Sequence, residues 1–176
     1  MYVRKKGGYD AFPLMTEVTS IHAPKIMKTK PVTVLVVDAQ GGGLGRQLIA
    51  TIRKTIGDLH ILAVGTNTAA TSAMLKAGAD EAATGENPVL VASRKADFII
   101  GPVGMVIANA MLGEITPAMA RAIAEADAKR IMIPFNSCDN YIAGVSDYST
   151  GHLIQEAVDH LKKDITEERE GKRIDE

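Results

Sequence analysis

The sequence predicts an α/β protein built on a doubly wound, Rossmann-like sheet that is mainly parallel, with about six strands and with helices on both faces. Short β-branched runs alternate along the chain with segments in which apolar residues recur at helical spacing, an order that is typical of parallel strands joined by helices. Glycine-rich loops follow two of these strands, at residues 41–45 and 101–104. Because such crossovers are right-handed, we expect helices on both faces of the sheet.

The first strand and the first helix have the clearest pattern. The run Val-Thr-Val-Leu-Val-Val at residues 32–37 is continuous and ends at Asp38, which predicts a strand buried on both faces. After the glycines, Leu48, Ile52 and Ile56 recur at helical spacing while charged and polar residues take the other face. This pattern predicts an amphipathic helix that packs on the sheet.

The same alternation continues along the chain. Asn87-Pro88 and Thr116-Pro117 each have the pattern of an N-cap followed by a first helical position, so each is expected to begin a helix. The remaining strands are expected at residues 60–64, 81–83, 97–100 and 130–134, and the remaining helices at residues 69–77, 87–94 and 116–126.

The last strand is expected to run against the others. Only residues 135–140 separate the fifth strand from the apolar segment at residues 141–145, and so short a connection cannot make the crossover that a parallel neighbour needs. We therefore expect residues 141–145 to form an antiparallel strand at the edge of the sheet. A closing helix follows, since Ile154, Val158 and Leu161 lie on one apolar stripe.

The chain is predicted to divide into three parts. Residues 1–30 mix glycine, proline and scattered charges without a sustained period, which predicts an irregular N-terminal extension outside the core. Residues 31–164 are expected to form the Rossmann-like domain, and residues 165–176 a charged C-terminal tail. We expect a homo-oligomer, in which the extension orders against a partner subunit.

Composition argues against several classes of partner. The 176 residues carry a net charge of −1 and no basic stripe, so nucleic acid, whose binding needs clustered Lys and Arg, is not expected. No apolar run reaches the roughly 20 residues of a membrane span, so no membrane is expected either. The single cysteine, Cys138, rules out an internal disulfide and fits a reducing compartment, which favours the cytoplasm.

The glycine-rich turn after the first strand is the strongest sign of function. Glycines let the backbone turn sharply and let a ligand approach with no Cβ in the way. The helix that follows presents N–H groups and a partial positive charge, which suit a phosphate or a carboxylate. The turn comprises Asp38, Gly41, Gly42, Gly43, Leu44, Gly45 and Arg46, the last of which can add its guanidinium to the same anion.

The turn matches no strict phosphate-binding fingerprint. When the dinucleotide pattern G-x-G-x-x-G is aligned on Gly43 and Gly45, Leu48 stands in place of the third glycine. The acid that usually holds a ribose at the end of the second strand is replaced by Thr66 and Asn67. A P-loop fits less well, because the Lys and the hydroxyl residue that it needs after its last glycine are absent. The cofactor is therefore left open, and both NAD(P) and another nucleotide are compatible with the turn.

A second glycine-rich loop supports the same site. In the strand order 3-2-1-4-5-6, the first and fourth strands flank the crevice in which a ligand binds. Gly101 and Gly104 follow the fourth strand, so both glycine-rich loops are expected at that crevice. The predicted site for a small phosphate-bearing ligand thus combines the first turn with Thr66, Asn67, Gly101 and Gly104.

Few groups at this edge are suited to chemistry. Asp38, Glu86, Cys138 and Asp139 follow strands at the correct end of the sheet. Asp38 can accept from ligand hydroxyls, but bonding the N–H groups of its own turn explains it at least as well. Glu86 is best explained as a helix-start charge, and Cys138, without a partner histidine, as an inert thiol. The predicted topology brings no core histidine to the crevice: His60 begins a parallel strand and His152 begins the helix after an antiparallel one, so both are expected at the opposite edge. No spacing predicts a metal site.

Three long segments, at residues 36–45, 63–79 and 101–116, agree in order with one family. Together they resemble an uncharacterised bacterial family catalogued as a domain of unknown function with Rossmann-like character. The resemblance covers roughly residues 32–163 and is specific, because several long segments agree. It implies a fold and no activity.

The sequence thus predicts a domain that binds a nucleotide, a dinucleotide or a similar phosphate-bearing metabolite. One hypothesis is an NAD(P)-linked oxidoreductase, with the nicotinamide toward residues 101–104. The other is a non-catalytic metabolite sensor or regulatory module, which the small size and the few catalytic groups favour. An active site shared across a dimer would permit the enzyme. An adenosyl cofactor or an acyl-CoA fits the same turn.

Overall fold

The computed structural model describes residues 31–134, 142–145 and 148–174. Its strands are β1 (Val32–Asp38), β2 (Leu59–Gly65), β3 (Glu81–Thr84), β4 (Phe98–Pro102) and β5 (Lys129–Ile133). Its helices are α1 (Gly43–Thr55), α2 (Thr68–Lys76), α3 (Glu86–Ser93), α4 (Pro117–Ala124) and α5 (Thr150–Ile174), and a short 3-10 helix, η1 (Val103–Val106), follows β4.

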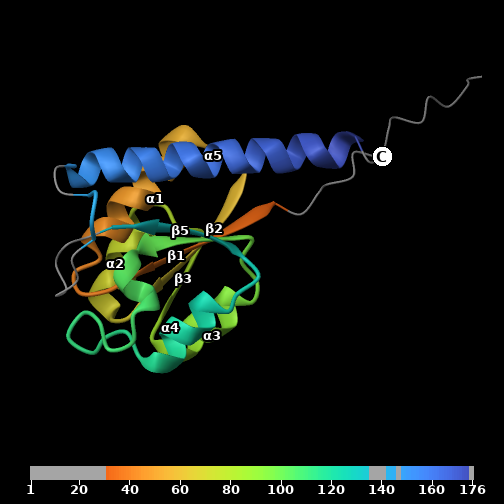
Figure 1. The fold of residues 1–176 in the computed structure, drawn as a ribbon. Helices are drawn as coiled ribbons and strands as arrows, with labels where there is room; N and C mark the ends of the chain where they lie inside the picture. The colour runs from red at the N-terminus through yellow and green to blue at the C-terminus, as the bar shows by residue number, and fades with distance from the viewer. Residues whose placement is uncertain (1–30, 135–141, 146–147, 175–176) are drawn as a thin grey trace, which may run out of the picture.

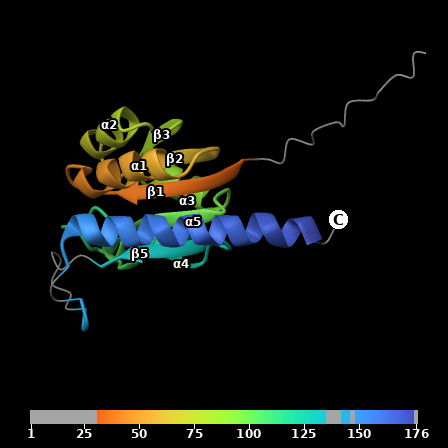
Figure 2. The ribbon, with the colours of Figure 1, turned by 90° about the horizontal axis from the view of Figure 1, so that it is seen from above.

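The strands form one sheet in the order β3-β2-β1-β4-β5, and every neighbouring pair is parallel. Helices α1, α2 and α5 cover one face, and α3 and α4 cover the other (Figures 1 and 2). This arrangement follows from the right-handed crossovers that join parallel strands. The predicted doubly wound α/β fold is confirmed.

The central strand β1 separates two hydrophobic cores. Val34 and Val36 point into the core under α1 and α5, whereas Leu35 and Val37 point into the core under α3 and α4. Successive side chains of a strand face opposite sides, and all four side chains are 0% exposed. The unbroken apolar run in the sequence therefore reflects burial on both faces.

The predicted antiparallel sixth strand is wrong where the structure describes it. Residues 142–145 contain a turn, and Gly144 has a φ of 88°, a left-handed conformation that does not continue a strand. The remaining residue of that prediction, Tyr141, lies outside the described residues. Among the described residues between β5 and α5 no strand reverses the chain, and α5 begins at the carboxyl edge of the sheet (Figure 2).

The predicted start of the third helix is also shifted. α3 begins at Glu86, so Asn87 is inside the helix, and Gly85 occupies the N-cap with a φ of 102°. That φ favours glycine, which explains why the chain turns into the helix there. Thr116 does cap α4 as predicted, and its hydroxyl accepts from Met119 N at 3.2 Å.

Helix α5 includes most of the predicted C-terminal tail. Ile165 is 2% exposed and belongs to the same core as Val158 and Leu161, and the helix continues to Ile174. The predicted domain boundary at residue 164 therefore falls within a helix. The predicted extension at residues 1–30 and the last two residues lie outside the described residues.

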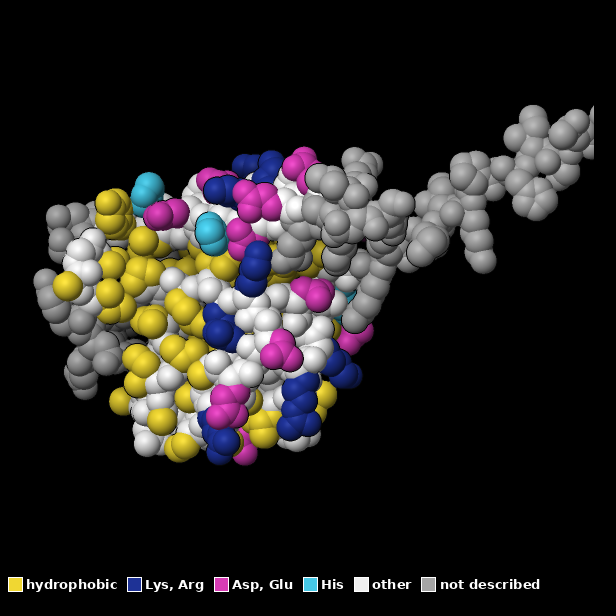
Figure 3. Space-filling view, turned by 45° about the vertical axis from the view of Figure 1, so that its right-hand side comes forward, with side chains coloured by type: hydrophobic (Ala, Val, Ile, Leu, Met, Phe, Trp, Pro, Cys, Tyr) yellow, Lys and Arg dark blue, Asp and Glu magenta, His cyan; other side chains and the backbone are white. Residues whose placement is uncertain are grey.

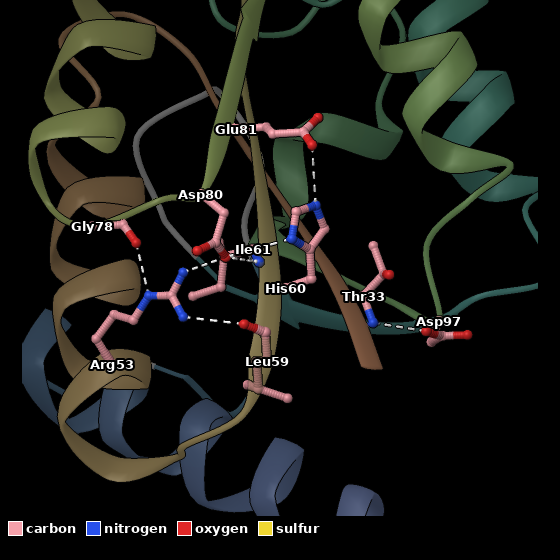
Figure 4. A network of polar contacts seen from close by, with 9 residues as sticks. All are labelled: Thr33, Arg53, Leu59, His60, Ile61, Gly78, Asp80, Glu81 and Asp97. Atoms are coloured by element: carbon pink, nitrogen blue, oxygen red, sulfur yellow. Dashed lines mark hydrogen bonds and ion pairs between the residues drawn. The ribbon is translucent and has the colours of Figure 1, made fainter. Parts of the chain in front are cut away.

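A polar network joins α1 to the amino ends of the strands (Figure 4). Arg53 donates through Nε to Gly78 O at 2.7 Å and through Nη1 to Leu59 O at 3.1 Å. Its Nη2 pairs with Asp80 Oδ2 at 2.5 Å, and His60 Nδ1 lies 3.7 Å from the same oxygen. His60 is thus held at the edge opposite the glycine-rich turn, as predicted.

An apolar groove lies along β5 beneath α5. In Figure 3 charged side chains of α5 lie along the top of the molecule, above a band of hydrophobic side chains. The groove has a volume of about 390 Å³, and its apolar lining includes Ile131, Met132, Ile133, Val145, Leu153 and Ala157.

Candidate functional site

The loops after β1 and β4 meet at the carboxyl edge of the sheet. β1 pairs with β2 on one side and with β4 on the other, so the strand order reverses between β1 and β4. A crevice outside the strand ends is expected at such a point. The predicted neighbourhood of the two glycine-rich loops is therefore present, and we call residues 38–46 the glycine turn.

Asp38 is committed to the glycine turn itself. It is 6% exposed, its Oδ1 accepts from Ala39 N at 2.8 Å, and its Oδ2 accepts from Gly45 N at 2.6 Å. Burial raises the pKa of Asp38 above its ordinary value, more than the hydrogen bonds from Gly45 and Ala39 lower it. Of the two predicted roles, the structure places Asp38 in the one that bonds its own turn, and the N–H of Gly45 is taken.

The four glycines of the turn have two different surroundings. A Cβ on Gly42 would lie 2.6 Å from Ala70 Cα, and one on Gly45 would lie 2.5 Å from Met74 Sδ. These two glycines allow α1 and its turn to pack against α2. A Cβ on Gly41 or on Gly43 would meet nothing within 4 Å, so these two glycines border open space.

The same two glycines carry N–H groups without an internal partner. Within the part of the chain that the structure describes, neither Gly41 N nor Gly43 N donates to a protein acceptor, whereas Gly42 N donates to Ala39 O at 3.0 Å. The φ values of Gln40 and Gly42 are 52° and 67°, and Gly41 between them has no positive φ. Such alternation makes a concavity of amide groups that suits an anion.

The other residues predicted around the turn differ in exposure. Arg46 is exposed and forms no ion pair within the described ranges, so its guanidinium is available one turn into α1. Leu44 is half-buried and packs against the core under α1.

Gly101 and Gly104 are buried and crowded. A Cβ on Gly101 would lie 2.4 Å from Val37 O, and one on Gly104 would lie 2.9 Å from Met111 Cε. Gly101 is the fourth residue of β4, where the lack of a side chain lets the strand lie close to β1, and Gly104 in η1 lets the following loop lie close. The structure thus places both glycines in packing contacts, unlike Gly41 and Gly43.

Glu114, which sequence reasoning missed, joins the two loops. Its Oε2 accepts from Gln40 N at 2.9 Å, from Asn67 Nδ2 at 2.9 Å and from the Thr66 hydroxyl. We call Glu114, Gln40, Thr66 and Asn67 the Glu114 cluster. It brings the predicted residues Thr66 and Asn67 to the glycine turn, while Asn67 also caps α2 by accepting from Ala70 N at 3.0 Å.

The Glu114 carboxylate is stabilised in its charged form. Burial raises its pKa, but hydrogen bonds from Thr66, Gln40 and Asn67 lower the pKa more, so that it lies below the ordinary value. In the sequence the only sign was a Gly-Glu pair within the long segment at residues 101–116. An isolated loop glutamate is usually solvated, so this sign was too weak to use.

The loop that carries Glu114 is strained. Asn109, Met111 and Leu112 have φ values of 64°, 57° and 59°, a region that costs energy for residues with a side chain. Leu112 is 98% exposed, whereas Ile115 is 1% exposed. Backbone strain of this kind is found where surrounding structure holds a functional segment in place.

The remaining candidates divide between structural roles and residues outside the description. Glu86 accepts from the Thr116 hydroxyl and so joins the starts of α3 and α4. Cys138 and Asp139 lie outside the described residues. His152 was expected at the opposite edge, but α5 begins at the carboxyl edge, where His152 stacks on Tyr148 with 5.0 Å between the ring centroids.

Neither a metal-binding cluster nor a membrane-spanning helix is present among the described residues. They contain no group of three or more His, Cys, Asp or Glu residues placed to hold a metal ion. None of their helices combines the length and the apolar character that crossing a membrane requires.

Comparisons with known proteins give a match to one family model. Residues 33–166 match a family described as a domain of unknown function (DUF3842), as the resemblance of the long segments predicted. No curated protein matched the chain. A similar solved structure is that of a dodecameric FMN-dependent Ubix-like decarboxylase from Escherichia coli O157:H7, which is 11% identical over 77% of this chain and 95% of that chain, with a TM-score of 0.44. A likeness that low carries no argument about the site.

Proposed function

The chain belongs to the DUF3842 family, a domain of unknown function, and we propose that it binds a phosphate-bearing small molecule, foremost a nucleotide, at the open side of the glycine turn. One observation carries this proposal. Gly41 and Gly43 border open space, and their N–H groups donate to no acceptor within the described residues. Unpaired N–H groups at the start of a helix attract an anion.

The surroundings of the two glycines support the same ligand class. α1 spans 13 residues, so its N-terminus carries a partial positive charge. Arg46 is exposed one turn into that helix and can pair with a phosphate in a bidentate manner. Asp38 occupies the inner N–H of Gly45, and the anion is therefore assigned to the outer N–H groups.

The test is a thermal-shift panel of NAD, NADP, AMP, ATP, S-adenosylmethionine and CoA. A ligand present at a hundred times its Kd stabilises the folded state by about 2.7 kcal/mol, which raises the Tm by a few degrees. Cofactor turnover with a substrate library, measured on the same protein, separates an NAD(P)-linked oxidoreductase from a non-catalytic sensor.

The first prediction is that Gly43→Val abolishes the shift and leaves the fold intact. The new side chain fills the open space beside the N–H groups, so the anion cannot approach. Gly57→Val is the matched control, because a Cβ there also meets nothing within 4 Å but lies beyond the other end of α1. Normal ligand binding by Gly43→Val, or equal loss in both variants, would overturn the proposal.

A further inference from the structure

No acidic residue directly follows β2 in the sequence, but in the folded protein a carboxylate from another loop lies beside the end of this strand. Gly65 ends β2, and Thr66 and Asn67, which follow it, both donate to the carboxylate of Glu114. In doubly wound nucleotide-binding sheets, a carboxylate at the end of the second strand accepts from the ribose hydroxyls. Here Glu114, in the loop between η1 and α4, places its carboxylate beside the end of β2.

The two oxygens of the Glu114 carboxylate differ in the hydrogen bonds that they accept. Oε2 accepts from Gln40 N, from Asn67 Nδ2 and from the Thr66 hydroxyl. Oε1 accepts from no group within the described ranges, and the side chain is only partly buried. One oxygen is therefore fixed by the protein, and the other remains able to accept a hydroxyl of a ligand.

Glu114 is held in place before any ligand arrives. The neighbouring Ile115 is 1% exposed, and its carbonyl accepts from Asn109 N at 2.8 Å. These contacts, with the strained backbone at Met111 and Leu112, fix the end of the loop. A group fixed in its bound position loses little conformational entropy on binding, which favours affinity and selectivity.

The charge of the Glu114 cluster decides which ribose fits. No Lys or Arg in the described part of the chain pairs with Glu114, and the nearby Asp38 is a second carboxyl group whose pKa Glu114 raises further. A phosphate on the 2′-oxygen of a ribose would therefore meet like charge without a cation to offset it.

We infer that Glu114 is the residue that determines the sugar specificity of the site, so that it accepts a ligand with a free ribose 2′-hydroxyl and rejects one that is phosphorylated there. The inference rests on the proposed function, since the phosphate of the same ligand lies on Gly41 and Gly43. It narrows the ligand class to ribonucleotides such as AMP or NAD and excludes NADP.

Isothermal titration with four probes tests the inference. The probes are AMP, 2′-deoxy-AMP, adenosine 2′,5′-bisphosphate and inorganic pyrophosphate, each titrated into the wild type, Glu114→Gln and Glu86→Gln. The wild type should bind AMP at least about tenfold more tightly than either altered nucleotide. With 2′-deoxy-AMP the Glu114 carboxylate lacks one hydrogen bond, and with adenosine 2′,5′-bisphosphate it meets an added negative charge. Glu114→Gln should bind AMP about tenfold less tightly and lose the preference.

Glu86→Gln is the matched control for charge. Glu86 also accepts from a threonine hydroxyl at this edge of the sheet, so its replacement removes the same charge without touching the Glu114 cluster. It should keep the preference of the wild type. Unfolding curves of both variants check that the fold is intact. The comparison of the four probes on the wild type does not depend on either variant.

The outcomes separate the two proposals. Equal affinity of the wild type for AMP and 2′-deoxy-AMP, or an unchanged preference in Glu114→Gln, overturns the inference and leaves the proposed function standing. Binding of pyrophosphate but of no nucleotide has the same meaning. Failure of all four probes to bind refutes the proposed function, and the inference with it.

Discussion

At the scale of single residues, a glycine is required either by the backbone conformation or by the lack of room around its Cα. Gly42 meets both conditions, because its φ is 67° and Ala70 lies where a Cβ would stand. Gly41 meets neither condition, since its φ is not positive and its surroundings are open. Neighbouring glycines in one turn thus serve the fold and the ligand separately.

The second prediction follows from this contrast. Gly42→Ala should lower the free energy of unfolding by about 2–4 kcal/mol, since a left-handed alanine costs about 1–2 kcal/mol and a backbone clash costs as much again. Gly41→Ala should change it by less than about 0.5 kcal/mol. Chemical denaturation measures both values. Equal values for the two variants would contradict the contrast.

Single residues also explain which part of the site was predictable. The glycine turn stands out in sequence because its members are neighbours and precede an amphipathic stripe. Glu114 does not stand out, because it meets Thr66 from 48 positions away and only the sheet order brings the two together. Gly101 was predicted to line the ligand site, but it packs against Val37. Close packing and ligand binding both require glycine, so the sequence alone cannot separate the two roles.

At the scale of elements, strand patterns were predictable to within about two residues. The second strand was expected at residues 60–64 and is Leu59–Gly65, and the fifth was expected at residues 130–134 and is Lys129–Ile133. Burial on both faces imposes a continuous apolar run, which marks a strand clearly. Residues 141–145 have similar apolar content, but Gly144 turns the chain, and apolar content alone cannot separate the two cases.

The third prediction concerns α5. If the domain ended at residue 164, substitutions beyond it should hardly change the free energy of unfolding. Ile165, however, is 2% exposed in the core under that helix. Ile165→Ala should therefore lower the free energy of unfolding by about 2–4 kcal/mol. Lys162→Ala, at an exposed position of the same helix, should change it by less than about 0.5 kcal/mol. Similar denaturation midpoints for the two variants would place Ile165 in a tail after all.

At the scale of the whole molecule, the direction of the chain decides which side chains share an edge. The alternation of strands and helices sufficed to predict the sheet, because parallel crossovers permit few arrangements. The prediction of one antiparallel strand nevertheless led us to expect the start of α5, and with it His152, at the wrong edge of the sheet. The same topology brings Glu114 and Asp38 together at the carboxyl edge, where their pKa values shift in opposite directions.

This opposition predicts how the stability of the whole protein depends on pH. The pKa of Glu114 is lowered from 4.5, so its stabilisation is present above that value and is lost as the pH falls through its pKa in the folded protein. The pKa of Asp38 is raised from 3.8, so its contribution has the opposite sign: it is present below 3.8 and is lost as the pH rises through the raised value. Acid therefore removes one contribution while it restores the other.

Glu114→Gln should remove the contribution that acid takes away, and it should also move the pKa of Asp38 back toward its ordinary value, because the Glu114 charge raises that pKa. The variant should be less stable than the wild type at neutral pH, and the difference in Tm should shrink as the pH falls below 4.5. Asp80, whose pKa is also lowered, acts equally in both proteins and cancels from that difference. Thermal unfolding across this range measures it, and parallel curves for the two proteins would show that the Glu114 cluster does not couple the two loops to folding.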